Sequence, residues 1–203
     1  MKKIVFICTH QYSGSNELYY AMDKHPRIQG CKSIYGNVYN SAQTIISVCG
    51  IRHKLRNKSS IYMDEITYNN QISNNCVFDY CKFIFLIRSP EAVLSEIISN
   101  EGINSIFAVR RYSFRLRRIC EFAKKSGDGV LLTYDDLCEA KGINLINDYL
   151  ELSSPINFDP LLLKSGDKKF NMDLLEPVLR SEVFDSYERY LYFLKSLPLR
   201  RPR

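Results

Sequence analysis

The chain of 203 residues has no tryptophan, and its seven cysteines form neither a C-x-x-C pair nor a cluster with histidine. These absences argue against a thiol redox motif and against a Cys/His metal site. The odd, scattered cysteines indicate reduced thiols in a reducing compartment. No apolar run approaches the ~20 residues of a membrane span, and the apolar stretch Ile4–Cys8 is shorter than the core of a secretory signal. We therefore expect a cytoplasmic protein that has no membrane partner.

What the chain does contain is an ordinary globular composition with a small excess of basic residues. The net charge of +6 suits anionic small molecules and nucleic acid alike, so charge alone does not choose between these partners. A length of 203 residues fits one domain with a sizeable core. We expect a single domain over residues 1–199, followed by a basic, solvated C-terminal tail over residues 200–203.

Uninterrupted apolar and β-branched runs predict buried strands at Lys3–Cys8, Ile61–Asp64, Phe83–Ile87 and Val130–Thr133. Apolar residues at helical spacing predict helices at Ser15–Lys24, Ser41–Leu55, Tyr68–Tyr80, Glu91–Ser99, Ile106–Lys125, 134–149 and Asp173–Leu194. Strands that alternate with helices predict a three-layer α/β fold, in which helices flank a mostly parallel central sheet. Ligands of such sheets bind at the carboxyl ends of the strands, so the loops after the strands should meet at one edge.

A polar loop joins the first strand to its helix and reads Thr-His-Gln-Tyr-Ser-Gly-Ser-Asn from Thr9 to Asn16. A turn rich in glycine and serine at this place presents backbone N–H groups at a helix N-terminus, where hydrogen bonds and the helix dipole favour phosphate or sulfate. The loop is not a Walker A motif, because Ser15 follows Gly14 where a lysine would stand. Taken alone, the loop also fits a plain helix cap after a strand.

A second polar position follows the strand Phe83–Ile87. Arg88 stands at the carboxyl end of this strand, and Ser95 lies about two helical turns further on. A guanidinium there can bind a phosphate bidentately, and the serine hydroxyl can add a hydrogen bond. The alternative is a structural ion pair between Arg88 and Glu91 or Asp64.

Together these segments resemble the family of sulfotransferases that use 3'-phosphoadenosine 5'-phosphosulfate (PAPS). Tyr12–Leu18, followed by His25-Pro26, is similar to the family's 5'-phosphosulfate loop, R-S-G-S/T-T-L-L and then H-P. The segment Lys82–Ser95 is similar to the 3'-phosphate segment, K-F-I-F-L-V-R-D-P-R-A-V-x-x-S. The segment Leu131–Leu137 is similar to the later L-x-x-Y-E-D-L. The matches span most of the chain in the family's order.

The resemblance implies a P-loop-like fold and transfer of a sulfuryl group from PAPS to a hydroxyl or amine of a small-molecule or carbohydrate acceptor, without a metal. It implies that the 5'-phosphosulfate is wrapped by the loop residues Tyr12, Ser13, Gly14, Ser15 and Asn16. Arg88 and Ser95 would hold the 3'-phosphate, and Tyr134 would line the adenosine side. The family serine usually lies eight residues after the arginine, where this chain has Glu96, so Ser95 is one position short.

The chain departs from the family at the catalytic positions. Family members stabilise the charge on the leaving nucleotide with a lysine or arginine beside the loop, where this chain has Tyr12. The tyrosylprotein branch has a glutamate base where this chain has Lys32 and a catalytic lysine where it has Glu65. One hypothesis is an exchange, in which Lys32 stabilises charge and Glu65 is the general base; the other is that both residues are ordinary and solvated. His10 is a third candidate base, unless it is a loop histidine bonded to backbone.

Three other functions stay open from the sequence. The first is a non-catalytic relative that binds PAPS or its bisphosphate product, because Tyr12 replaces the expected cation. The second is a P-loop kinase, for which Asp64 is the evident metal-binding candidate. The third is a nucleic-acid module that uses the basic helix Ile106–Lys125. In that helix Arg111, Arg115 and Arg118 share a stripe, which we interpret as a solvated face, while Ile119 and Phe122 are expected to face the core. The alternative is that the early part of this helix approaches the 3'-phosphate, which would make Arg110 or Arg111 further candidates. We therefore expect a small-molecule partner and no nucleic acid.

Overall fold

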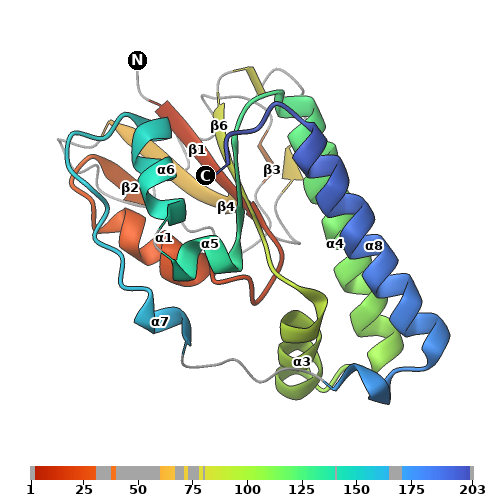
Figure 1. Ribbon diagram of the computed structural model, residues 1–203. Coiled ribbons are helices and arrows are strands. Elements are labelled where there is room, and N and C mark those ends of the chain that lie inside the picture. The colour runs from red at the N-terminus through yellow and green to blue at the C-terminus, as the bar shows by residue number, and fades with distance from the viewer. Residues whose placement is uncertain are drawn as a thin grey trace.

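The structure is a computed structural model that describes residues 3–30, 38–39, 60–66, 71–72, 78–79, 81–139, 141–164 and 171–201. Its centre is a sheet of five parallel strands (Figure 1). From one edge to the other the order is β2 (Ile28–Gly30), β4 (Ile61–Ile66), β1 (Lys3–Thr9), β6 (Cys81–Ile87) and β7 (Val130–Thr133). Helices cover both faces, so the predicted three-layer α/β fold with a parallel central sheet is confirmed.

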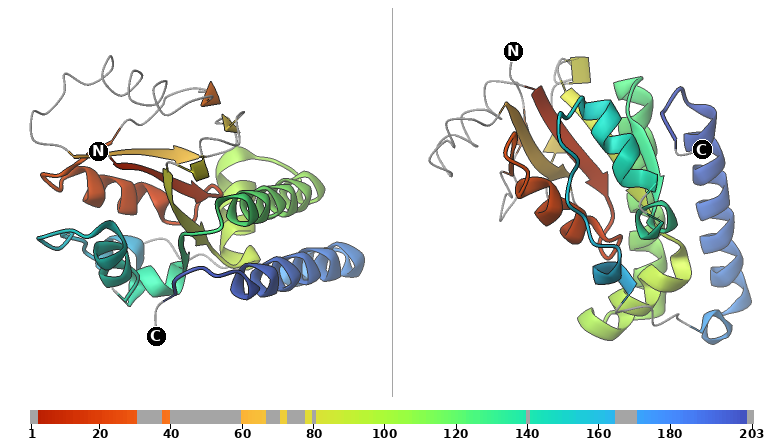
Figure 2. Two further views of the ribbon diagram at one scale, coloured as in Figure 1. Left: turned by 90° about the horizontal axis from the view of Figure 1, so that it is seen from above. Right: turned by 60° about the vertical axis from the view of Figure 1, so that its left-hand side comes forward.

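The helices form one layer on each side of the sheet (Figures 1 and 2). One layer contains α1 (Ser15–Asp23), α5 (Tyr134–Cys138) and α6 (Lys141–Leu150). The other contains α3 (Pro90–Glu101), α4 (Ser105–Ser126) and α8 (Pro177–Ser196), and in every view α4 and α8 lie side by side. A short helix, α7 (Leu161–Lys164), and a 3-10 turn, η2 (Met172–Leu174), connect α6 to α8.

The core explains why the central strands read as unbroken apolar runs. Side chains alternate along a strand, so Val5 and Ile7 of β1 pack under α1 while Phe6 and Cys8 pack under α4. Residues 4 to 8 are buried because helices cover both faces. Burial also raises the pKa of the Cys8 thiol far above its ordinary value, which fits a cysteine that serves as a small apolar side chain.

The connections at the centre of the sheet create a place for a ligand. From β1 the chain passes to α1 on one face, whereas from the adjacent β6 it passes to α3 on the other face. Where the connections of two neighbouring parallel strands leave in opposite directions, a crevice opens at the carboxyl ends of these strands. In this chain that position is flanked by the loop after Thr9 and by Arg88.

Several predicted boundaries differ from the structure. The helix predicted over Tyr68–Tyr80 is wrong at β5 (Gln71–Ile72), because these residues pair in parallel with β3 (Val38–Tyr39) and long-range pairing outweighs local helical spacing. The helix predicted over 134–149 is two helices, α5 and α6. The last helix begins at Pro177, because a proline is favoured in the first turn, where its missing N–H is not needed. The predicted helix Ser41–Leu55 lies outside the described residues.

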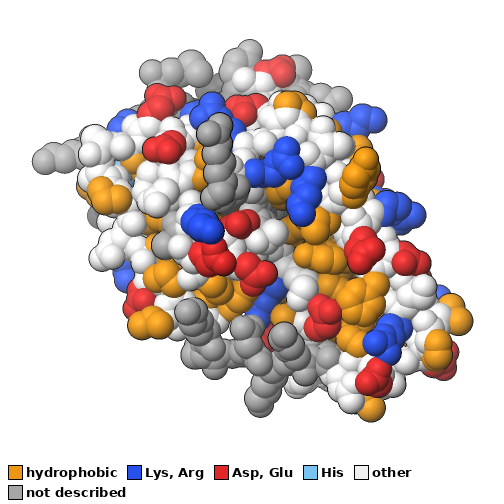
Figure 3. All heavy atoms as spheres, in the orientation of Figure 1, with side chains coloured by type: hydrophobic (Ala, Val, Ile, Leu, Met, Phe, Trp, Pro, Cys, Tyr) orange, Lys and Arg blue, Asp and Glu red, His pale blue; other side chains and the backbone are white. Residues whose placement is uncertain are grey.

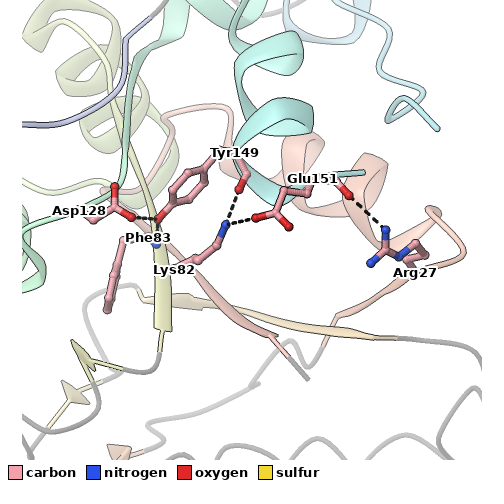
Figure 4. A network of polar contacts seen from close by, with 6 residues as sticks. All are labelled: Arg27, Lys82, Phe83, Asp128, Tyr149 and Glu151. Atoms are coloured by element: carbon pink, nitrogen blue, oxygen red, sulfur yellow. Dashed lines mark hydrogen bonds and ion pairs between the residues drawn. The ribbon is translucent and has the colours of Figure 1, made fainter. Parts of the chain in front are cut away.

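A network of hydrogen bonds and an ion pair lies at the amino ends of the strands, which we call the amino edge of the sheet (Figure 4). The Lys82 ammonium donates to the Tyr149 carbonyl at 2.5 Å and pairs with the Glu151 carboxylate at 3.5 Å. The amide of Phe83 donates to the Tyr149 hydroxyl at 3.3 Å. Arg27 adds a hydrogen bond to the Glu151 carbonyl at 3.1 Å. The network fastens the end of α6 to the start of β6.

Arg200, near the end of the described chain, is also bonded to the sheet at the amino ends of its strands. Arg200, which the sequence analysis assigned to a solvated tail, forms a parallel bridge with Val130. Its amide donates to the Gly129 carbonyl, and its carbonyl accepts from the Leu131 amide, both at 2.9 Å. Its guanidinium lies 5.1 Å from the centre of the Tyr149 ring. The chain is therefore bonded to the sheet up to Arg200.

The surface in the orientation of Figure 1 carries acidic and basic side chains together (Figure 3). Hydrophobic side chains gather on the part of this face where α4 and α8 lie. The exposed large hydrophobic residues of these two helices are Ile106, Phe107, Phe114, Val178 and Tyr192. In the described part of the chain, no helix has a stretch that is both long and hydrophobic enough to pass through a bilayer.

Candidate functional site

The loop after β1 turns sharply into α1. Gly14 precedes the first helical residue with a φ of 85°, and Tyr12 has a φ of 59°, so two residues of this short loop adopt the left-handed region. The Thr9 hydroxyl closes the base of the loop through hydrogen bonds to the Ser13 hydroxyl and, at 3.1 Å, to the Leu86 carbonyl. Gly14 has no side chain that could cap the first N–H groups of α1. The helix therefore begins in the way that favours an anion.

Arg88 lies directly against this loop. Its Nη1 donates to the Tyr12 carbonyl at 2.8 Å, and its guanidinium stacks over the Tyr134 ring with Cζ 3.9 Å from the ring centre. The residue is only 8% exposed, so the charge is held in place rather than solvated. Its own carbonyl accepts from the Tyr112 hydroxyl at 2.6 Å. The carboxyl end of β6 thus delivers a fixed cation to the loop after β1.

Gly14 and Tyr134 are also in contact. A methyl group on Gly14 would lie 3.1 Å from the Tyr134 ring and 3.0 Å from the Leu163 side chain, distances at which the neighbours would have to move. The Tyr134 hydroxyl donates to the Leu163 carbonyl and so fixes α7 beside the loop. Gly14, Arg88 and Tyr134 follow the ends of three different strands, and both Gly14 and the Arg88 guanidinium lie against the Tyr134 ring. The structure therefore brings together these three predicted site residues.

His10 is bonded on both sides of its ring. Nε2 accepts the Arg88 amide at 2.9 Å, and Nδ1 donates to the Gln11 carbonyl at 2.9 Å. Burial lowers the pKa of His10 to about 4, so the ring is neutral at pH 7. In this arrangement the lone pair of His10 is already used within the fold, as in the alternative of a loop histidine bonded to backbone.

Glu65 is buried at the carboxyl end of β4, next to the start of α1. Its Oε1 accepts the Ser15 hydroxyl at 2.5 Å, and its amide donates to the Asp64 carboxylate at 2.8 Å. The description of Glu65 as an ordinary solvated residue is therefore wrong, because only 7% of it is exposed. Lys32, the other half of the proposed exchange, lies outside the described residues.

The remaining predicted residues lie in the loop itself and in α3. The Tyr12 hydroxyl donates to the Glu101 carboxylate at 3.2 Å, and burial together with this carboxylate raises the pKa of Tyr12. Ser13 is buried inside the loop and Asn16 is exposed. In α3, Ser95 is buried, whereas the adjacent Glu96 is half-buried and bonds Asn100 at 2.7 Å. The helix therefore keeps Ser95, rather than Glu96, on its inner side.

Arg115 of α4 is the residue that the sequence analysis misjudged most. It was placed on a solvated stripe, yet only 6% of it is exposed. Its Nε donates to the Thr9 carbonyl at 2.7 Å and its Nη2 to the Ile66 carbonyl, so it ties together the ends of β1 and β4. Its position between Tyr112 and Ile119 in the apolar helical repeat was the available signal.

The other predicted residues of this helix behave differently from Arg115. Ile119 and Phe122 are buried, as predicted. Arg111 pairs with Glu101 at 2.6 Å and also donates to Gln11, whereas Arg118 pairs with Glu121 at 3.0 Å. Burial lowers the pKa of Arg115 to about 10, which still leaves it charged at pH 7. The basic helix is therefore engaged with the loop and with acidic neighbours rather than presenting a uniform basic face.

No family model and no curated protein matches this chain. The resemblance to sulfotransferases therefore depends on the sequence motifs alone and stays a prediction. Within the described ranges, no group of three or more His, Cys, Asp and Glu side chains could hold a metal ion.

Proposed function

We propose that this chain binds an adenosine nucleotide with phosphates on both sides of the ribose and transfers a sulfuryl group from PAPS to a hydroxyl or amine of a small-molecule or carbohydrate acceptor. The observation that carries the proposal is that Gly14, Arg88 and Tyr134 meet at the carboxyl ends of the strands, which we call the carboxyl edge of the sheet. The Arg88 guanidinium donates to the loop carbonyl of Tyr12 at 2.8 Å and stacks on Tyr134 at 3.9 Å. This arrangement combines a helix N-terminus, a buried cation and an aromatic ring.

Each part suits one portion of the nucleotide. The backbone N–H groups at the start of α1 suit a phosphosulfate, because hydrogen bonds and the helix dipole both favour negative charge there. Arg88 supplies a buried guanidinium, a group that binds phosphate through charge-assisted hydrogen bonds. Tyr134 offers an apolar ring on the adenosine side.

The position of Arg88 also matters because this chain has Tyr12 where the resemblance leads us to expect a lysine or arginine. In the proposed reaction the bond between sulfur and the bridging phosphate oxygen breaks while a bond from the acceptor oxygen or nitrogen to sulfur forms, and the acceptor loses a proton. Negative charge develops on the bridging oxygen, so a fixed positive charge near the loop lowers the barrier. Arg88 holds the 3'-phosphate in this proposal, so its buried charge would act on the bridging oxygen through space and not by direct contact.

Glu65 is the proposed base. Its carboxylate contacts Ser15, a loop residue, at 2.5 Å and so lies next to the place assigned to the phosphosulfate. A carboxylate there can accept the proton that the acceptor releases. Lys32 remains a prediction for charge stabilisation.

Thermal shift with three ligands tests the proposal. Adenosine 3',5'-bisphosphate and PAPS should each stabilise the protein by ~3 kcal/mol at 100 times Kd, which is a rise of several degrees in Tm for a chain of this size. ATP with Mg²⁺ should stabilise it less. Transfer of labelled sulfate from PAPS to a panel of hydroxyl and amine acceptors then separates an enzyme from a non-catalytic binder. The absence of any shift with the bisphosphate would overturn the proposal.

A P-loop kinase is the second candidate, because one observation favours it. P-loop enzymes hold Mg²⁺ with a loop hydroxyl and an acidic residue on a neighbouring strand, and Ser15 and Glu65 are such a pair. Asp64, the acidic residue expected in this role from the sequence, is buried and accepts the Glu65 amide at 2.8 Å. Against this candidate, no lysine follows Gly14. A larger shift with ATP–Mg²⁺ than with the bisphosphate would favour the kinase.

A further inference from the structure

The outward side of α4 carries one regular stripe of side chains. Its members recur at alternating intervals of three and four residues, and all of them are exposed. In chain order the stripe consists of Phe107, Arg110, Phe114, Arg117, Glu121 and Lys124. This spacing places side chains in one line along a helix, and it is the spacing with which two helices pack against each other. The stripe therefore has the geometry of a helix–helix contact.

The stripe exposes large apolar side chains. Phe107 is 60% exposed and Phe114 is 42% exposed, and Ile106 beside the stripe is 42% exposed. The neighbouring helix α8 adds Val178 and Tyr192, and hydrophobic side chains gather over these two helices (Figure 3). Exposed aromatic rings that alternate with arginines are typical of protein–protein interfaces. The composition of the stripe therefore indicates a protein partner.

The stripe is complementary to itself when it is reversed. A second copy of α4 can pack antiparallel to the first about a two-fold axis that passes between Phe114 and Arg117, at the middle of the stripe. Arg110 then faces Glu121 of the second copy, and Phe114 faces Arg117 of the second copy. The first contact is an ion pair and the second is a cation–π contact, and the symmetry forms each of them twice. The outermost residues of the stripe, an aromatic ring and a lysine, face each other in the same way.

The side chains of the stripe are able to make these contacts. Within one copy the Arg117 guanidinium lies 5.2 Å from the centre of the Phe114 ring, so these two residue types already attract each other in the stripe. Glu121 pairs with Arg118 at 3.0 Å and with Arg117 at 3.8 Å, but 44% of its side chain is exposed, and a carboxylate can accept further donors. Among the residues that the structure describes, Arg110 has no ion-pair partner.

The mixed charges of this surface favour a second copy over a membrane or a nucleic acid. Both of these partners are uniformly anionic and would meet the Glu121 carboxylate in the middle of the stripe. Figure 3 also shows acidic as well as basic side chains around the hydrophobic patch over α4 and α8. A second copy of the stripe instead places each charge opposite a charge of the other sign or an aromatic ring.

We propose that the chain forms a two-fold symmetric dimer through antiparallel contact of α4 along this stripe. The 22 residues of α4 give a contact about 33 Å long. Two single helices cover less surface than the roughly 800 Å² per partner of a standard interface, so we expect a reversible dimer with a Kd in the micromolar range. The proposal is independent of nucleotide binding.

Sedimentation equilibrium of the full chain tests the dimer. Between about 1 and 300 μM, the average mass should rise from the 23.7 kDa of one chain towards twice that value, as a micromolar Kd requires. The mass of a single chain at every concentration would overturn the proposal.

Charge reversal tests the antiparallel register. Arg110→Glu sets carboxylates opposite each other, and Glu121→Arg sets guanidinium groups opposite each other, so each variant alone should raise the Kd by at least ~10-fold. An equimolar mixture of the two variants should restore the Kd to within about threefold of the wild type, because both ion pairs of the mixed dimer again join opposite charges. Failure of the mixture to restore association would contradict the register.

Two further variants and a vesicle assay complete the test. Phe114→Ala removes an exposed ring near the two-fold axis and should raise the Kd by ~10-fold. Lys24→Glu is the control for net charge, because Lys24 is exposed at the end of α1 in the other helical layer, and it should change the Kd less than twofold. A chain that stays monomeric but cosediments with vesicles of phosphatidylcholine and phosphatidylserine would assign the stripe to a membrane and overturn the proposal.

Discussion

The polar groups at the amino ends and at the carboxyl ends of the strands of the central sheet, the amino edge and the carboxyl edge, are held in different ways. At the amino edge, Lys82 is paired with a carboxylate and a carbonyl, and the Tyr149 ring lies 4.5 Å from the Lys82 ammonium and 5.1 Å from the Arg200 guanidinium. At the carboxyl edge, Arg115 is bonded to backbone carbonyls alone. The amino edge therefore fastens helices and Arg200 to the sheet, whereas the carboxyl edge holds the buried charges of Arg88, Arg115 and Glu65 beside the loop after β1.

Replacement of Arg88 should have the largest effect on nucleotide binding at the carboxyl edge. Arg88→Met removes the cation that touches the loop and the Tyr134 ring, so affinity for adenosine 3',5'-bisphosphate should fall by ~100-fold. Titration calorimetry measures the loss, and circular dichroism checks that the variant is folded. A folded variant with unchanged affinity would show that Arg88 has a purely structural role.

Lowering the pH should destabilise the folded protein, because protonation of His10 is unfavourable in its buried position at the carboxyl edge. The pKa of this ring is lowered from 6.5 to about 4 in the folded protein, so the unfolded chain binds the proton first. The contribution of His10 to the free energy of unfolding is then constant above pH 6.5 and falls as the pH drops from 6.5 towards 4. Below pH 4 the total loss is about 3 kcal/mol.

Urea unfolding at several pH values measures this loss. His10→Gln removes the titrating ring, and its stability should decline less than that of the wild type between pH 6.5 and 4. Parallel curves for the two proteins would mean that His10 is not the group responsible.

A side chain at Gly14 should affect both stability and binding. Gly14→Ala places a methyl group 3.1 Å from the Tyr134 ring at a φ that glycine favours, so we expect a loss of stability of ~1–2 kcal/mol. Gly102→Ala is a matched control, because Gly102 has a similar φ of 63° and nothing within 4 Å of the added methyl group. Bisphosphate binding should fall in the first variant alone; equal binding losses in both would remove Gly14 from the site.

Replacing Lys82 should have the smallest effect and should leave binding intact. Lys82→Met removes a partly exposed ion pair and a hydrogen bond at the amino edge, so stability should fall by ~1 kcal/mol. Its affinity for the bisphosphate should stay within twofold of the wild type, as titration calorimetry would show. A loss comparable with that of Arg88→Met would remove the distinction between the two edges.

The sequence predicted the parts of the fold that depend on local pattern. The unbroken apolar runs of β1 and β6 identified buried parallel strands, whose carboxyl ends lie on the same side of the sheet. The loop after Thr9 comes next to Arg88 because β1 and β6 are neighbours in the sheet. Pairing of β3 with β5 was missed, because strands of two residues carry almost no pattern.

The candidate site was predictable in its loop positions but not in its buried partners. Arg115 was assigned to solvent because charged side chains are rarely buried, and its compensation comes from two carbonyls that are distant in sequence. The bond from the Ser15 hydroxyl to Glu65 likewise joins residues 50 positions apart. Such contacts depend on how the strands are ordered, which local pattern does not specify.

Titration calorimetry with adenosine 3',5'-bisphosphate and with adenosine 5'-phosphate tests the central claim most directly. If the start of α1 and Arg88 each hold an anion of one nucleotide, the bisphosphate should bind at least ~10-fold more tightly than the monophosphate. Equal affinities, or no binding of either ligand, would contradict the account.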